Sequence, residues 1–168
     1  TWNDNCDGTG VVTGSDASNG NTCPETITRT WTYTDACGNI ATVSQIITVE
    51  DITAPTFAGL PGATAVECIG DLPAMIDLTW NDNCDGTGVV TGSDASNGNT
   101  CPETITRTWT YTDACGNIAT VSQIITVEDI TAPTFAGLPG ATAVECIGDL
   151  PAMIDLTWND NCDGTGVV

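Results

Sequence analysis

An exact internal repeat constrains this chain more than any other feature. Residues 1–8 recur unchanged at 79–86 and again at 157–164, so the period is 79 − 1 = 78 residues. A period of this length exceeds the usual solenoid unit and matches a small independent domain. The pattern therefore predicts a string of identical domains. It favours a repeated structural element over an enzyme, which needs only one site.

The positions of proline and glycine in the sequence indicate the expected domain boundaries. We place a boundary at the dipeptide Ala54-Pro55, which returns one period later. Residues 55–132 then form one complete copy. Residues 1–54 are the C-terminal part of a preceding copy, and residues 133–168 are the N-terminal part of a following one.

The charge balance excludes several partners. The chain has 22 acidic residues against 2 basic ones, for a formal net charge of −20. Nucleic-acid binding needs a basic face, and anionic membrane surfaces repel such a chain. No apolar run approaches the roughly 18 residues of a membrane span, so membrane insertion is not expected. With 40% apolar residues the chain has enough material for a core, which argues against disorder.

Cysteine use points to an oxidising compartment. The chain has nine cysteines and no histidine, and it contains no Cys-x-x-Cys pair of the kind that binds zinc. Disulfides persist mainly in secreted and cell-surface proteins, so we expect an extracellular location. Without histidine or lysine the chain also lacks the usual bases for nucleophilic catalysis and the lysine that isopeptide crosslinks require, and we expect no enzyme.

Short β-rich runs separated by turn residues predict an all-β fold. In residues 104–112, threonine alternates with Ile105, Arg107, Trp109 and Tyr111, the period of two that is typical of a strand. Further strands are expected at residues 63–68, 75–81, 88–92 and 119–127. Several short antiparallel strands in 78 residues predict an immunoglobulin-like β-sandwich, repeated in tandem, with Trp80 and Trp109 in the core.

Two motifs resemble a known family. The run CPETITRTWTYTDACGN at residues 101–117 and the run VEDITAP at residues 127–133 are similar to hyalin-repeat-like modules of large bacterial surface proteins, which are abundant in Bacteroidetes adhesins. The resemblance implies immunoglobulin-like domains in an extracellular stalk or adhesin. Family members often carry two further cysteines where Leu60 and Val121 stand here, so that bridge is replaced by apolar packing.

The sandwich topology narrows the disulfide pairing. An extended strand of about ten residues spans roughly 33 Å, whereas bridged Cα atoms lie within about 7 Å. We therefore expect one bridge at each end of a domain, and pairing of neighbours in sequence, 68–84 and 101–115, remains an alternative. The predicted pairs are Cys68–Cys101, Cys84–Cys115 and Cys6–Cys37. Cys23, Cys146 and Cys162 are expected to be unpaired here, with partners in further copies.

The linker between copies is a candidate calcium site. Glu50 and Asp51 are expected to meet the loop carboxylates Asp82, Asp85 and Asp113 of the next copy, and oxygen-rich sites of this kind suit Ca²⁺. The equivalent residues one period on are Glu128, Asp129, Asp160 and Asp163. Residues 81–86 match the opening of a calcium loop, yet position 12 is Gly92 instead of glutamate, so the loop is no EF-hand. The alternative is that these acids only stabilise turns.

These observations predict a disulfide-stapled structural repeat of an extracellular filament or adhesin stalk, whose partners are neighbouring copies of itself. A module that binds a glycan or a host protein is the main alternative, although the loops carry few aromatic residues. A second alternative concerns assembly. Short subunits could join head to tail by strand donation, because residues 1–54 lack the first strands of a domain.

Overall fold

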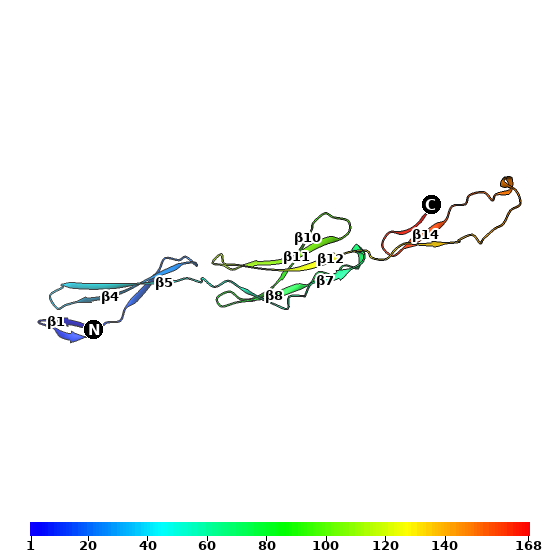
Figure 1. Ribbon diagram of the computed structural model, residues 1–168. Helices are drawn as coiled ribbons and strands as arrows, with labels where there is room; N and C mark the ends of the chain where they lie inside the picture. Colours follow the sequence, from blue (N-terminus) through cyan, green and yellow to red (C-terminus); the bar gives the residue numbers. More distant parts are fainter. The chain divides into compact units, whose positions relative to one another are not determined.

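The computed structural model describes all of residues 1–168, and it is built almost entirely of short β-strands (Figure 1). The strands are β1 (Trp2–Asp4), β2 (Gly8–Gly10), β3 (Ser15–Ser18), β4 (Glu25–Thr34), β5 (Ile40–Val49), β6 (Thr56–Ala58), β7 (Thr64–Val66), β8 (Asp77–Asp82), β9 (Gly86–Thr91), β10 (Ser93–Ser96), β11 (Glu103–Thr112), β12 (Ile118–Val127), β13 (Thr134–Ala136), β14 (Thr157–Asp160) and β15 (Gly164–Val167). Two 3₁₀ turns, η1 (Ile69–Asp71) and η2 (Ile147–Asp149), are the only helical segments. Neither turn has the length and hydrophobicity that a helix needs to cross a membrane.

The contacts divide the chain into two compact units that do not follow the sequence period. Unit 1 comprises residues 1–58, 79–90 and 110–120, and unit 2 comprises residues 59–78, 91–109 and 121–168. Each unit therefore combines parts of two successive copies. The expected boundaries at residues 54 and 132 rest on the period alone and stay predictions.

In unit 1, β3, β4 and β5 form an antiparallel sheet in this order. The β4–β5 pairing runs from Glu25↔Val49 to Thr34↔Ile40 without a break, as the alternation of β-branched residues predicts. A second sheet has the order β6-β8-β9, in which Phe57 is paired with Trp80. The Trp80 ring stacks on Tyr111 with the ring centroids 3.8 Å apart.

Glycine is required where this tryptophan lies against the neighbouring strand. A Cβ atom at Gly88 would stand 2.5 Å from the Trp80 ring, closer than atoms can approach. The sequence therefore places a residue without a side chain opposite the ring, and the same spacing holds between Gly10 and Trp2 in the first copy.

Unit 2 holds the best-buried core. Ile105, Ile125 and Val127 form a cluster, with Val66 and Leu72 packed against it. These residues belong to the sheet with the strand order β10-β11-β12-β7, in which β7 runs parallel to β12, and to the segment that follows β7 (Figure 1). The alternation predicted for residues 104–112 is thus the inward and outward face of β11.

Two polar groups complete this core. Trp109 is fully buried, and its Nε1 donates a hydrogen bond to the carbonyl of Ile76 at 2.9 Å. Arg107 is only 4% exposed; its guanidinium pairs with Asp94 at 2.8 Å and donates to the carbonyl of Ala74. Burial of an arginine is tolerated because the charge is paired and its donors are used.

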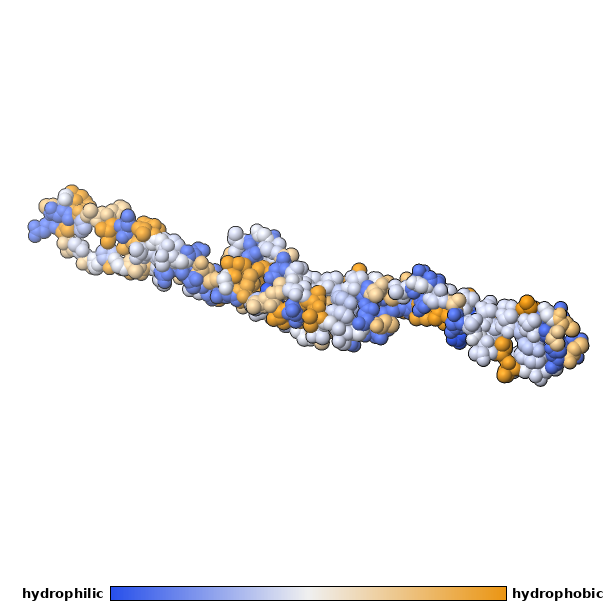
Figure 2. Space-filling model, turned by 180° about the vertical axis from the view of Figure 1, so that it is seen from behind, coloured by the Kyte–Doolittle hydropathy of each residue, from blue (hydrophilic) through white to orange (hydrophobic).

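The fold class is therefore that predicted from the sequence: tandem immunoglobulin-like antiparallel β-sandwich domains. Trp80 and Trp109 are both buried, as expected for core residues. On the face shown in Figure 2, apolar patches alternate with polar ones. The two arginines, Arg29 and Arg107, both form ion pairs with aspartates, so no basic patch is present.

Candidate functional site

Chemically distinctive side chains gather where one copy meets the next. We call two such places joints. The first joint consists of the linker 50–55, the loops 82–86 and 113–117, and Cys23, all in unit 1. The second joint consists of the linker 128–133, the loop 160–164, and Cys68 and Cys101, all in unit 2.

A disulfide crosses the first joint. Cys23 is bonded to Cys115, with the two Cα atoms 5.2 Å apart and a sequence separation of 92 residues. Two residues of one 78-residue copy are at most 77 positions apart. The bond therefore joins successive copies.

A different disulfide crosses the second joint. Cys68 is bonded to Cys162, with a Cα–Cα distance of 5.1 Å and a separation of 94 residues. Both Cα–Cα distances fall in the range found for disulfides. Each joint in this chain is therefore closed by a covalent bond in addition to its linker.

These bonds correct the predicted pairing. The pairs Cys68–Cys101, Cys84–Cys115 and Cys6–Cys37 are wrong, and so is the expectation that Cys23 and Cys162 are unpaired. The free cysteines are Cys6, Cys37, Cys84, Cys101 and Cys146. Cys68 and Cys101 do line the same hollow, but that hollow also receives Cys162 of the next copy. The prediction considered one domain at a time, and the thiols are bonded across the joint instead.

Three buried carboxylates converge in the first joint. Asp51 of the linker is 9% exposed, and Asp82 and Asp113 of the two loops are each 6% exposed. One carboxylate oxygen from each of the three residues lies within 4.8 Å of the others. The predicted meeting of linker and loop acids thus occurs for these three residues.

One oxygen of each carboxylate holds its own loop in shape. Asp51 Oδ1 accepts the N–H of Thr53, and Asp82 Oδ1 accepts the N–H groups of Cys84 and Asp85 at 2.8 and 2.9 Å. The other oxygens of Asp51 and Asp82, both named Oδ2, are buried without any hydrogen-bond partner. An unpartnered buried carboxylate oxygen is costly, and these two oxygens are the unsatisfied polar groups of the joint.

Asp113 is more completely bonded. Its Oδ1 accepts the N–H groups of Cys115 and Asn117, and its Oδ2 accepts the side-chain amide of Asn117 at 2.8 Å. Burial raises the pKa of Asp113, but these hydrogen bonds outweigh burial, and the pKa lies below its ordinary value. Asp113 is therefore ionised at neutral pH.

Two asparagines tie the loops to the linker. Asn117 donates its amide to the carbonyl of Asp51 at 3.0 Å as well as to Asp113. Asn83 donates to Asp51 Oδ1 at 3.2 Å. Asn117 was not among the site residues predicted from the sequence. Its position four residues after Asp113, in every loop of the form Asp-Ala-Cys-Gly-Asn, was the available signal.

The remaining predicted metal ligands lie elsewhere. Asp85 Oδ2 accepts the hydroxyl of Tyr111 and the N–H of Ala114, so this carboxylate braces the two loops against each other. Glu50, Glu128 and Asp163 are exposed, and none of them belongs to a carboxylate cluster. The acids of the first joint also surround Cys84, and slight burial together with the charges of Asp51, Asp82 and Asp85 raises the pKa of this thiol.

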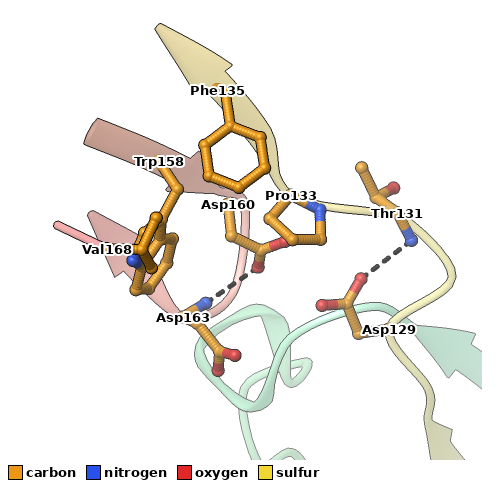
Figure 3. A pocket seen from close by; sticks show the side chains of 8 residues that line it. All are labelled: Asp129, Thr131, Pro133, Phe135, Trp158, Asp160, Asp163 and Val168. Carbon is orange, nitrogen blue, oxygen red and sulfur yellow. Dashed lines mark hydrogen bonds between the residues drawn. The ribbon is translucent and has the colours of Figure 1, made fainter. Parts of the chain in front are cut away.

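The second joint contains a similar cluster, in which two aspartates and a cysteine lie close together. Asp129, Asp160 and Cys162 converge within 4.8 Å, and Asp129 and Asp160 are the counterparts of Asp51 and Asp82 (Figure 3). The N–H of Thr131 donates to Asp129, and the N–H of Asp163 donates to Asp160. Backbone hydrogen bonds from Asp163 and Cys162 hold the pKa of Asp160 below its ordinary value.

One hollow at the second joint corresponds to a place that a side chain fills in the other copies. It has a volume of about 380 Å³ and lies against Trp158 and Phe135 (Figure 3). In the other two copies a tyrosine stacks on the equivalent tryptophan, Tyr33 on Trp2 and Tyr111 on Trp80. The hollow lies on the face of the tryptophan where a tyrosine ring stacks in those two copies, so it provides no argument for a small-molecule ligand.

The fold and the bonds between copies define a tandem array of disulfide-stapled immunoglobulin-like domains. The profile of the HYR-like domain with 4 cysteines matches residues 1–49 and 56–127, well over half of the chain. The chain belongs to this family, and the resemblance stated from its sequence motifs is confirmed at that level. No curated protein and no solved structure shows significant similarity to the chain.

Proposed function

We propose that this chain is a structural repeat of a bacterial extracellular filament or adhesin stalk, in which every joint between copies is closed by two disulfides. The observation that carries the proposal is the pair of bridges, each of which joins successive copies of an exactly repeated domain. Bonds of this kind serve an array of domains and do nothing for a single domain. The disulfides and the family support an extracellular location, and we expect no catalytic activity.

The two bridges use different cysteines of the repeat, so they are compatible at one joint. Each copy has four cysteines in order; Cys68, Cys84, Cys101 and Cys115 are the first to fourth in the complete copy. Cys23 is a third cysteine bonded to the fourth of the next copy. Cys68 is a first cysteine bonded to the second of the next copy. A joint with all four cysteines present would therefore hold both bonds.

Two of the free cysteines, Cys84 and Cys101, lie at the joints, as their bonded counterparts Cys162 and Cys23 do. At the second joint Asn161 Nδ2 contacts the bonded sulfur of Cys162 at 3.3 Å, and at the first joint Asn83 Nδ2 contacts the free sulfur of Cys84 at 3.1 Å. Likewise, Cys101 Sγ lies 3.9 Å from the linker carbonyl of Asp129, beside a hollow of about 950 Å³. At the first joint the equivalent residue, Cys23, is bonded to Cys115.

The same register accounts for all five free thiols. The partner of Cys101 would be residue 115 + 78 = 193, and the partner of Cys84 would be residue 68 − 78 = −10, both outside the 168 residues. The partners of Cys6, Cys37 and Cys146 fall outside by the same arithmetic.

Peptide mapping of a longer array under non-reducing conditions tests this proposal. An oxidised array of four copies should yield two crosslinked peptide pairs, first-to-second and third-to-fourth cysteine. Copies alternately labelled with ¹⁵N should show that both pairs join neighbouring copies. Crosslinks confined within single copies would refute the joint as described. The same array should show no saturable binding on glycan and protein arrays, whereas an adhesive module would show it.

A further inference from the structure

We propose that the carboxylates of Asp51, Asp82 and Asp113 form a calcium site that is completed only when two successive copies meet. The acidity of the cluster is not the argument, since exposed acids often lie together without an ion. Asp51 and Asp82 of this cluster are each at least nine-tenths buried, and each has a buried oxygen without a hydrogen-bond partner.

The two oxygens of each carboxylate have different surroundings, and this difference supports a calcium site. In Asp51 and Asp82, the first oxygen accepts backbone N–H groups, and the second has no hydrogen-bond partner. If the carboxylates served only as turn residues, as the alternative from the sequence holds, the second oxygens would face solvent. Here they are buried.

The chemistry of the donors selects the ion. Three carboxylates with a neighbouring backbone carbonyl, that of Asp51, make a hard, all-oxygen set, and irregular loops can adjust to the six to eight ligands that Ca²⁺ takes. Both arginines are already committed to Asp16 and Asp94, so no side-chain cation competes for the site. The inference stands on the geometry of the joint and holds whether or not the array is a filament.

The repeat supplies matched controls for the test. Asp4 and Asp35 are the equivalents of Asp82 and Asp113 in the first copy, and they make the same bonds to their own loops. Both are free of any carboxylate cluster. Asp82→Asn and Asp4→Asn therefore make the same change in equivalent loops. Asp82 lies in a cluster with the linker acid Asp51, and Asp4 does not.

The experiment is calorimetric titration of the oxidised, calcium-depleted full chain with calcium chloride at constant ionic strength. We expect one site of highest affinity per chain. Asp82→Asn and Asp113→Asn should weaken that site at least about tenfold, since loss of even an outer partner of a metal ligand typically costs that much. Asp4→Asn and Asp35→Asn should leave it unchanged. Absence of calcium binding by the unaltered chain, or equal weakening by Asp4→Asn and Asp82→Asn, would overturn the site.

Thermal unfolding separates loss of the ion from loss of the fold. Asparagine retains the oxygen that accepts the loop N–H groups, so the Cys23–Cys115 bond should still form in Asp82→Asn, as peptide mapping can verify. With a chelator present, Asp82→Asn should melt no lower than the unaltered chain, because it removes one of three mutually repelling charges. With calcium present it should melt lower. A lower melting temperature under both conditions would show a purely structural role.

Discussion

Residues 1–54 and 79–132 have the same sequence, yet they differ in how deeply their side chains are buried. Trp109 is fully buried and Ile105 is 4% exposed, while their counterparts Trp31 and Ile27 are half-buried. The side chain of Arg107 is 4% exposed against 42% for Arg29. Within the complete copy, the segment that carries Ala74 and Ile76 covers Arg107 and Trp109 and accepts hydrogen bonds from both, whereas Arg29 is bonded to Asp16 alone.

What the two regions share is equally instructive. Both have the long hairpin, the tryptophan–tyrosine stack, the arginine–aspartate pair and the aspartate-held turn. All of these depend on contacts between residues within about 30 positions of each other. Local sequence thus sets the turns, pairings and stacks, and burial requires strands from farther along the chain.

The largest expected difference between the two regions concerns the disulfide. Cys115 is bonded to Cys23, whereas its counterpart Cys37 is free. Replacing Cys23 and Cys115 together by serine opens a loop of more than 90 residues, and this should lower the free energy of unfolding by about 4–5 kcal/mol in the chain-entropy picture. Cys37→Ser should change it little. Urea denaturation of oxidised protein followed by circular dichroism measures both, and equal effects would contradict the bond.

A smaller difference is expected for the core tryptophans. Trp109→Leu removes a buried ring and leaves the Ile76 carbonyl without its donor, so we expect a loss of about 2–3 kcal/mol. Trp31→Leu, at a half-buried position, should cost less than about 1 kcal/mol. The measurement is the same denaturation assay. Equal losses of stability in the two variants would mean that Trp31 is buried as completely as Trp109, which would contradict the structure.

The smallest expected difference concerns Asp35 and Asp113, whose turns are the local feature that both regions share. Asn39 donates to Asp35, and the pKa of Asp35 is lowered mainly by that bond. Burial raises the pKa of Asp113, yet the bonds from Asn117 leave it lowered too. Because both pKa values are below 3.8, this stabilisation is present above about pH 4 and is lost as the pH falls through the folded-state pKa.

Carboxyl ¹³C shifts followed against pH in calcium-free buffer test this expectation. Both pKa values should lie below 3.8, and Asn39→Ala and Asn117→Ala should raise the pKa of the aspartate in their own loop only. A lowered value at Asp113 alone would show that the turn needs the joint.

The sequence predicted those parts of the fold that depend on local pattern. The alternation in residues 104–112 located β11 within one residue, and both tryptophans chosen as core residues are buried. The burial of Arg107 was not predictable, because its carbonyl partner Ala74 lies 33 residues away. At the first joint, the prediction that the two loops meet the linker is correct. The sequence pattern could not distinguish Asp82, which belongs to the carboxylate cluster, from Asp85, which accepts a hydrogen bond from Tyr111.

The disulfide prediction failed for a specific physical reason. Strand direction correctly placed Cys68 and Cys101 beside the same hollow. The prediction assumed that a domain closes on itself, whereas Cys68 is bonded to Cys162 of the next copy. With identical repeats, spacing cannot distinguish a partner at residue 84 from one at residue 162, since both have the same neighbours. Only the packing across the joint decides.

The bonds between copies determine how far such an array can be stretched. With both bridges at every joint, two continuous covalent paths run through it, one along residues 101–115 of each copy and one along residues 68–84. These paths contain 115 − 101 = 14 and 84 − 68 = 16 residue steps per copy, against 78 for the backbone. At about 3.5 Å per residue, the shorter path allows roughly 50 Å per copy, compared with roughly 270 Å for the reduced chain. Most of residues 101–115 are β11, which is already extended. An oxidised array would transmit a pull almost without lengthening, even after its domains had unfolded.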